Sequence, residues 1–300
     1  MLKSRLCIAF FAFAVGCAPA QKPLTDYVNP MLGTATLWDS VDLGFKPTKR
    51  TWGAEVFPGS SLPNAMVQVS PVTKFHSGAG YQYEDSVIYG FTHTNKGHWN
   101  LCHIPLLPVT GTPTPGDYCS PFSHERESAA PGYYQVFLDR YGVDAQLSST
   151  LRCAFHKYTY PAGAAASLLA DLQRSNEHVR AWDIRKEGDN VFAGWQQTGE
   201  KMYFYAVANR PVTGIEPVVE GDREVRIVRF GEGDGALELR IGFSFVSEKN
   251  ARENLEAEML GKSFAEVRSE ATATWNDLLG RIRVEGGTER EKGCLLYTSP

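Results

Sequence analysis

The chain lacks both a hydrophobic run long enough to cross a membrane and an excess of positive charge. Its one strongly apolar run, Leu6–Val15, is about ten residues long, whereas a membrane-spanning helix needs about 20. Lysine and arginine number 30 against 34 acidic residues, so the net charge is −4. Because neutralising phosphates requires a basic surplus, we expect no nucleic-acid partner.

Several catalytic and cofactor motifs are also missing. The sequence contains no Cys-x-x-Cys and no His-Glu-x-x-His, the spacings that are typical of zinc sites. It contains no Gly-x-Ser-x-Gly, no phosphate-binding loop and no dinucleotide fingerprint followed by a helix. These absences disfavour a serine hydrolase and a nucleotide-dependent enzyme.

Cysteine is too scarce to build a disulfide framework. Of six cysteines, Cys7 and Cys17 lie in the apolar leader and Cys294 lies near the end of the chain. The remaining three cannot all pair with one another, so we expect them to be small buried hydrophobes. One bridge among Cys102, Cys119 and Cys153 stays open as an alternative.

The first 20 residues have the pattern of a secretory signal. Lys3 and Arg5 precede the apolar run, and Ala18-Pro19-Ala20 follows it, which predicts cleavage after Ala20. The alternative is lipidation at Cys17, because Ala14-Val15-Gly16-Cys17 is close to a bacterial lipoprotein box, and this would be the chain's only attachment to a membrane. We expect export to the periplasm, the outer surface or the medium of a bacterium.

Residues 25–246 have a strand-like pattern. Tyr133–Leu138 and Val143–Leu147 alternate apolar and polar residues, and turns rich in Gly, Asp, Asn or Pro separate many such runs. Short strands at this spacing indicate an antiparallel β-sandwich. The predicted fold class is therefore mainly β, an antiparallel β-sandwich followed by a helical linker.

Residues 247–283 change to a helical pattern. Ser263 and Glu266 form a predicted capping box. Apolar residues at steps of three and four then form one stripe, and we expect this stripe to need a partner beyond the sandwich: Phe264, Val267, Ala271, Trp275 and Leu278. Residues 284–300 are expected to begin another domain, although the tail 293–300 has no domain-ending pattern and looks foreign to the gene.

Histidine and aromatic residues concentrate in one segment. Four of the seven histidines are His76, His93, His98 and His103, with Trp99 among them. Aromatic rings stack on the apolar face of a sugar while polar side chains bind its hydroxyls, so this segment suits a sugar-binding loop. The alternative is an ordinary turn whose aromatic side chains pack in the hydrophobic core. We do not expect zinc here, and we expect His156 and His178 to be structural.

No pair of carboxylates can be identified from the sequence as a catalytic acid and base. A glycosidase needs two carboxyl groups that flank the scissile bond. The candidates lie in separate segments, where spacing alone cannot pair them, and each is expected to be a solvated or turn residue: Glu55, Glu84, Asp85, Asp171 and Glu177.

Taken in order, several motifs resemble glycoside hydrolase family 92, the exo-acting α-mannosidases. The resemblance covers roughly Thr25 to Lys292 and rests on these segments: Tyr27–Thr34, Val56–Pro71, Ser77–Tyr81, Ile88–Thr94, Trp275–Leu279 and Val284–Thr288. It implies an N-terminal β-sandwich, a helical linker and a C-terminal (α/α)6 catalytic barrel. It also implies an inverting, calcium-dependent enzyme that acts on mannose-containing oligosaccharides or glycoproteins.

In this family the catalytic acid, the catalytic base and most of the calcium site lie in the barrel. The resemblance therefore implies that this chain stops before the barrel, carries no catalytic or metal-binding residue, and is inactive alone. The sandwich is implied to supply a wall of the mannose pocket. We expect that wall to include Trp99, with His98, Asn100 and His93 beside it, and more weakly Trp52 and Glu55.

Residues 34–39 and the Lys/Arg-containing stretch that follows depart from the family pattern, where many members are shorter and glycine-rich. The sequence therefore assigns no linkage specificity. Two other functions stay open: a complete, non-catalytic carbohydrate-binding module, and a histidine-zinc hydrolase.

Overall fold

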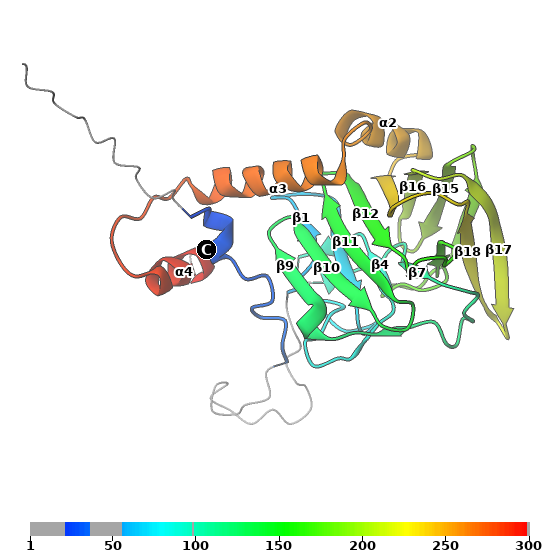
Figure 1. Cartoon of the computed structure of the whole chain (residues 1–300), viewed down its shortest axis with the longest axis horizontal. Coiled ribbons are helices and arrows are strands. Elements are labelled where there is room, and N and C mark those ends of the chain that lie inside the picture. The colour runs from blue at the N-terminus through cyan, green and yellow to red at the C-terminus, as the bar shows by residue number, and fades with distance from the viewer. Residues whose placement is uncertain (1–21, 37–55, 98, 299–300) are drawn as a thin grey trace, which may run out of the picture.

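The computed structural model describes residues 22–36, 56–97 and 99–298, with side chains described to residue 294. Within these ranges it has two large β-sheets followed by helices (Figure 1). No helix in this part of the chain is long and apolar enough to cross a membrane. The predicted leader, and with it Cys17, lies outside the described residues.

The smaller of the two large sheets has the strand order β1-β2-β4-β7-β13-β18-β17. Its strands are β1 (Ser60–Ser61), β2 (Gln68–Val72), β4 (Gly90–Thr92), β7 (Leu106–Val109), β13 (Ser167–Ala170), β18 (Arg223–Phe230) and β17 (Val212–Glu220).

The larger sheet has the order β14-β15-β16-β19-β12-β11-β10-β9. Its strands are β14 (Ala181–Lys186), β15 (Val191–Gln197), β16 (Lys201–Ala208), β19 (Leu237–Ser244), β12 (Cys153–Thr159), β11 (Val143–Ser149), β10 (Tyr133–Leu138) and β9 (Glu127–Ala130).

Two short pairs complete the strands, β3 (Val87–Ile88) with β8 (Ser120–Pro121) and β5 (Asn95–Lys96) with β6 (Trp99–Asn100). The helical elements are η1 (Leu24–Tyr27), η2 (His124–Arg126), α2 (Glu248–Glu258), α3 (Phe264–Leu279) and α4 (Glu289–Thr298).

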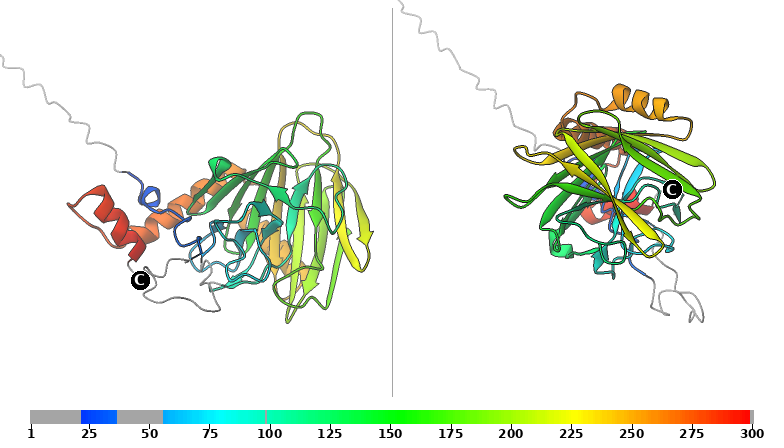
Figure 2. Two further views of the ribbon diagram at one scale, coloured as in Figure 1. Left: turned by 90° about the horizontal axis from the view of Figure 1, so that it is seen from below. Right: turned by 90° about the vertical axis from the view of Figure 1, so that its right-hand side faces the viewer.

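The two sheets face each other across one apolar core (Figure 2). In β16 every second side chain is buried, and Phe204 lies opposite Phe243 of β19. Side chains alternate between the two faces of a strand, so this pattern directs one face inward. The described ladders are all antiparallel, and the prediction of a mainly β, antiparallel sandwich is confirmed.

Helix α3 begins with the predicted capping box. The Ser263 hydroxyl accepts a hydrogen bond from the Glu266 backbone N–H, and the Glu266 carboxylate accepts one from the Ser263 backbone N–H at 2.8 Å. These reciprocal bonds satisfy two of the N–H groups that a helix start leaves without partners.

The expectation that the apolar stripe of α3 needs a partner outside the sandwich is wrong for the first part of the stripe. Phe264 and Val267 are buried in a second core cluster with Tyr133 of β10 and Phe155 of β12. The rings of Phe264 and Phe155 meet edge to face, with centroids 5.3 Å apart. The outer face of β10–β12 therefore covers the start of the stripe, whereas its last two residues are half-buried. Periodicity shows that a helix has an apolar face but does not identify what covers it.

The C-terminal half of α3 contacts the N-terminal segment. The indole N–H of Trp275 donates to the carbonyl oxygen of Ser61 in β1 at 2.7 Å. The side-chain oxygen of Asn276 accepts from the backbone N–H of Thr25 in η1 at 3.1 Å. Segments about 250 residues apart in the sequence therefore lie side by side, as Figure 1 shows for η1 and α3.

Cys102, Cys119 and Cys153 are free thiols in the structure, and Cys102 and Cys153 are buried. Burial raises the pKa of both buried thiols, which keeps them protonated and unreactive. These cysteines pack as small hydrophobes, and no disulfide joins them.

Two histidines form a buried pair inside the core. The Nε2 atoms of His93 and His156 are 3.1 Å apart, and the Tyr158 hydroxyl lies 2.5 Å from Nδ1 of His156. Burial lowers the pKa of His93 to about 3 and that of His156 well below its usual value. Both rings are therefore neutral, and the Tyr158 hydroxyl donates to His156, whose Nε2–H donates to His93.

Replacing Phe264 by alanine should detach α3 from the sandwich. We expect Phe264→Ala to lower the free energy of unfolding by about 3–5 kcal/mol, because it removes a buried aromatic ring and leaves a cavity. Leu260→Ala, at a residue that is 51% exposed in the same linker, should cost under about 1 kcal/mol. Urea denaturation of both variants measures the difference, and equal losses would show that α3 does not rest on the sandwich.

The buried histidine pair predicts that acid destabilises the fold. Unfolded histidines titrate near pH ~6.5, whereas the folded pair resists protonation. The stability that they contribute is complete above that pH. It falls by roughly 1.4 kcal/mol per histidine for each pH unit below it. Urea unfolding from pH 7.5 to 5 should show this fall in the free energy of unfolding. In His156→Gln the slope of that free energy against pH should correspond to about one proton fewer taken up on unfolding. An unchanged slope in His156→Gln would contradict the assignment.

Candidate functional site

The β5–β6 hairpin places Trp99 on the surface at one rim of the sandwich. Trp99 pairs with Lys96 across the two-residue ladder and is 38% exposed. The next residue, Asn100, points the opposite way and is fully buried. His98 lies outside the described residues, as do Trp52 and Glu55.

Asn100 holds the loops around Trp99 together. Its side-chain Nδ2 donates to the Ala79 carbonyl oxygen and the Thr92 hydroxyl, each at 3.3 Å, and its Oδ1 accepts from the Cys102 backbone N–H at 2.8 Å. A Cβ atom at Gly80 would lie 2.6 Å from Nδ2, so only glycine allows this approach. Asn100 therefore binds the protein rather than the solvent.

His93 is likewise enclosed. It is fully buried, and its ring stacks on His156 and lies 4.5 Å from the ring of Phe243. Of the predicted site residues that the structure describes, Trp99 alone is exposed, while Asn100 and His93 lie beneath it as parts of the support.

The backbone beside this hairpin is strained. Cys102 and Ile104 have φ values of 54° and 53°, in the left-handed region that β-branched residues rarely enter. Hydrogen bonds fix both positions, since Ile104 donates its N–H to Oε1 of Gln196 at 2.8 Å while Cys102 donates to Asn100. Strain of this kind concentrates at functional sites, and the residue held between the two is His103.

His103 is the centre of a polar network that the sequence did not single out. Its ring is 3% exposed. Nδ1 lies 2.9 Å from the Thr94 hydroxyl, and Nε2 lies 3.1 Å from the Thr198 hydroxyl and 3.3 Å from Oε2 of Glu177. Burial lowers the pKa of His103, although the Glu177 charge opposes this. The ring is neutral, so Thr94 donates to Nδ1 and Nε2–H donates towards Glu177 and Thr198.

Three other carboxylates that the sequence offered are bound in different places, and one of them, Asp171, is buried rather than solvated. Glu84 accepts from the backbone N–H of Thr36, and Asp85 accepts from the Thr73 hydroxyl. Asp171 is buried and accepts from Tyr118 and Arg223. Glu177 follows a loop that is hydrogen-bonded to Asn100 and Leu101, next to Trp99.

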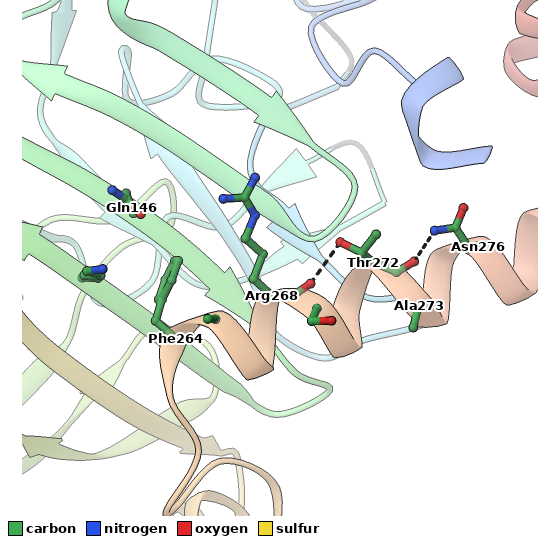
Figure 3. A pocket seen from close by; sticks show the side chains of 9 residues that line it. Gln146, Phe264, Arg268, Thr272, Ala273 and Asn276 are labelled. Atoms are coloured by element: carbon green, nitrogen blue, oxygen red, sulfur yellow. Dashed lines mark hydrogen bonds between the residues drawn. The ribbon is translucent and has the colours of Figure 1, made fainter. Parts of the chain in front are cut away.

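A hollow of about 590 Å³ lies elsewhere, between α3 and the outer face of β11–β12 (Figure 3). Gln146 and Lys157 line it from the sheet, and Arg268 and Asn276 line it from the helix. Arg268 lies over the ring of Tyr133, 3.6 Å from its centroid. The hollow shares no residue with the rim around Trp99.

The described residues contain no group of three or more His, Cys, Asp or Glu side chains that could hold a metal ion.

Comparison with known proteins agrees with the architecture. The chain is 24% identical over 314 residues to an uncharacterized secreted glycosidase of Arthroderma benhamiae. This alignment covers 87% of this chain and 38% of that protein. The family GH92 α-mannosidase BT3965 of Bacteroides thetaiotaomicron superposes with a TM-score of 0.79 at 25% identity, over 92% of this chain and 40% of that one. The inverting mannosidase BT2199 from the same species has the same fold, with a TM-score of 0.76 at 24% identity. The superposition covers 91% of this chain and 38% of that one.

The chain thus spans about two fifths of the length of these relatives. The model of the glycosyl hydrolase family 92 catalytic domain matches residues 250–299, which include α3 and α4. The model of the glycosyl hydrolase family 92 N-terminal domain matches residues 27–254, well over half of the chain. The chain therefore belongs to glycosyl hydrolase family 92.

Proposed function

We propose that this chain is the sugar-binding N-terminal part of an exported α-mannosidase that acts on mannose-containing oligosaccharides or glycoproteins. The observation that carries the proposal is the exposed indole of Trp99 on a rigid rim of the family's N-terminal domain. An aromatic face of this kind stacks on the C–H face of a pyranose. The similar mannosidase BT3965 has been solved in complex with mannoimidazole, which supports a mannose-type substrate.

Export is part of the proposal. It is supported by the leader pattern in the sequence and by the description of the Arthroderma benhamiae relative as secreted. We keep cleavage after Ala20 as the expected processing and lipidation at Cys17 as its alternative.

The chemistry belongs to residues outside those described. Inversion needs an acid and a base about 6.5–9.5 Å apart with a water between them, and Glu177 is one carboxylate without an identified partner of this kind. We therefore propose that the complete enzyme obtains its acid, its base and its calcium ligands from elsewhere. This domain binds and orients the sugar.

One observation favours a second function, that of a non-catalytic carbohydrate-binding module. The first part of the apolar stripe of α3 is covered by β10–β12, so the linker helix packs on the sandwich without another domain. Such a unit can bind sugar without a partner domain.

The complete gene product should hydrolyse an aryl α-mannoside with inversion of configuration, and a calcium chelator should abolish the activity, because the family resemblance implies a calcium-dependent inverting enzyme. NMR of the first-formed sugar anomer measures the stereochemistry. Calcium added back after chelation is the control. The 300-residue chain should be inactive alone, and hydrolysis by this chain, or none by the complete gene product, would refute the proposal.

Removing the Trp99 indole should weaken sugar binding. We expect Trp99→Ala to raise the KM of the complete enzyme roughly tenfold, because a stacking surface worth about 1.4 kcal/mol is lost. The KM of Trp99→Phe should lie between the KM of Trp99→Ala and that of the wild type. Val219→Ala, at a residue that is 64% exposed on β17, serves as the remote control. A KM for Trp99→Ala equal to that of the control would remove Trp99 from the site.

A further inference from the structure

Glu177 presents a carboxylate oxygen that its surroundings orient but do not use. The side chain is 41% exposed. Its Oε2 accepts from the Thr198 hydroxyl at 2.7 Å and from Nε2 of His103 at 3.3 Å. The described residues supply no hydrogen-bond donor to Oε1. One oxygen is therefore anchored in the protein, and the other faces outward as an acceptor with a fixed position.

This carboxylate lies on the same rim as Trp99. The Ser175 hydroxyl donates to the Leu101 carbonyl oxygen at 2.7 Å, and the Asn176 side chain donates to the Asn100 carbonyl oxygen at 2.7 Å. The loop that ends in Glu177 is thus hydrogen-bonded directly to the residues that follow Trp99. The segments that carry the aromatic face and the acceptor are therefore hydrogen-bonded neighbours.

The charge around this surface suits a neutral, hydroxyl-rich ligand. Lys96 pairs with Trp99 across the hairpin and is exposed, Glu177 is negative, and the buried His103 is neutral. These residues therefore give the hairpin and the neighbouring loop one charge of each sign. A carboxylate oxygen accepts hydrogen bonds from hydroxyl groups more strongly than a neutral acceptor does.

We propose that Oε1 of Glu177 accepts a hydrogen bond from a ring hydroxyl of the sugar that stacks on Trp99. His103 and Thr198 are positioning residues, which hold the carboxylate through its other oxygen. The inference rests on the proposed function, and it adds a sugar subsite that this chain can form without a catalytic domain.

The test uses the 300-residue chain and methyl α-D-mannopyranoside, with affinity measured by calorimetry or NMR titration. Wild-type chain should bind the sugar, and Glu177→Gln should weaken binding about tenfold, because an amide N–H₂ then faces the hydroxyl or the bonds to His103 and Thr198 are lost. Glu232→Gln changes an exposed carboxylate outside the rim and is the matched control.

Deoxy analogues of the methyl mannoside identify the contact. In the wild type, the analogue that lacks the bonded hydroxyl should bind about tenfold more weakly than the parent sugar. In Glu177→Gln the same analogue should bind as the parent does, a coupling that a merely structural role would not produce. Thr198→Val should show part of this coupling because it loosens the carboxylate.

The outcomes separate this inference from the proposed function. If the wild-type chain binds the sugar and the Glu177→Gln and Glu232→Gln variants bind it with the same affinity, Glu177 does not contact the sugar. The proposed stacking of the sugar on Trp99 then still stands. If the chain does not bind while the complete gene product hydrolyses mannosides, the independent subsite is wrong and the mannosidase assignment stands. If the complete gene product neither binds nor cleaves mannosides, both fail.

Discussion

The side chain of Asn100 is the contact on which the proposed binding surface depends. One buried amide binds the Ala79 carbonyl, the Thr92 hydroxyl and the Cys102 backbone. Its main-chain carbonyl accepts from Asn176. A buried amide that lost these partners would cost about 1–3 kcal/mol for each unpaired group, so the loops are held in one arrangement. The exposed indole next to it gains a fixed orientation from a residue that never meets the ligand.

Much of the fold could be predicted because it follows from local alternation. The run Tyr133–Leu138 became β10 and Val143–Leu147 became part of β11, since a period of two specifies a strand with one buried face. The covering of α3 could not be predicted in the same way. Its stripe is local, but Phe155 and Tyr133 lie more than 100 residues earlier in the sequence, and only the folded sheet brings them to the helix.

The candidate site likewise has a part that local sequence indicates and a part that depends on contacts between distant residues. The sequence could single out Trp99 as an aromatic residue among glycines and histidines, and the structure shows that it is exposed, while its contact with sugar stays a prediction. The partnership of His103 with Glu177 joins residues 74 positions apart, and neither residue has a spacing that signals it. Backbone strain at Cys102 and Ile104 is the physical marker of the network, and φ angles are not written in the sequence.

A division of labour between binding and chemistry explains why the rim combines a rigid frame with a neutral histidine. A general acid or base works best with a pKa near the operating pH, whereas burial lowers the pKa of His103 and removes it from that task. The same burial strengthens its hydrogen bond to Glu177, because fewer water molecules compete. The environment that disqualifies His103 as a proton carrier therefore suits it to hold a carboxylate still. Under the proposed function, a domain built in this way orients a sugar and leaves bond cleavage to groups placed elsewhere.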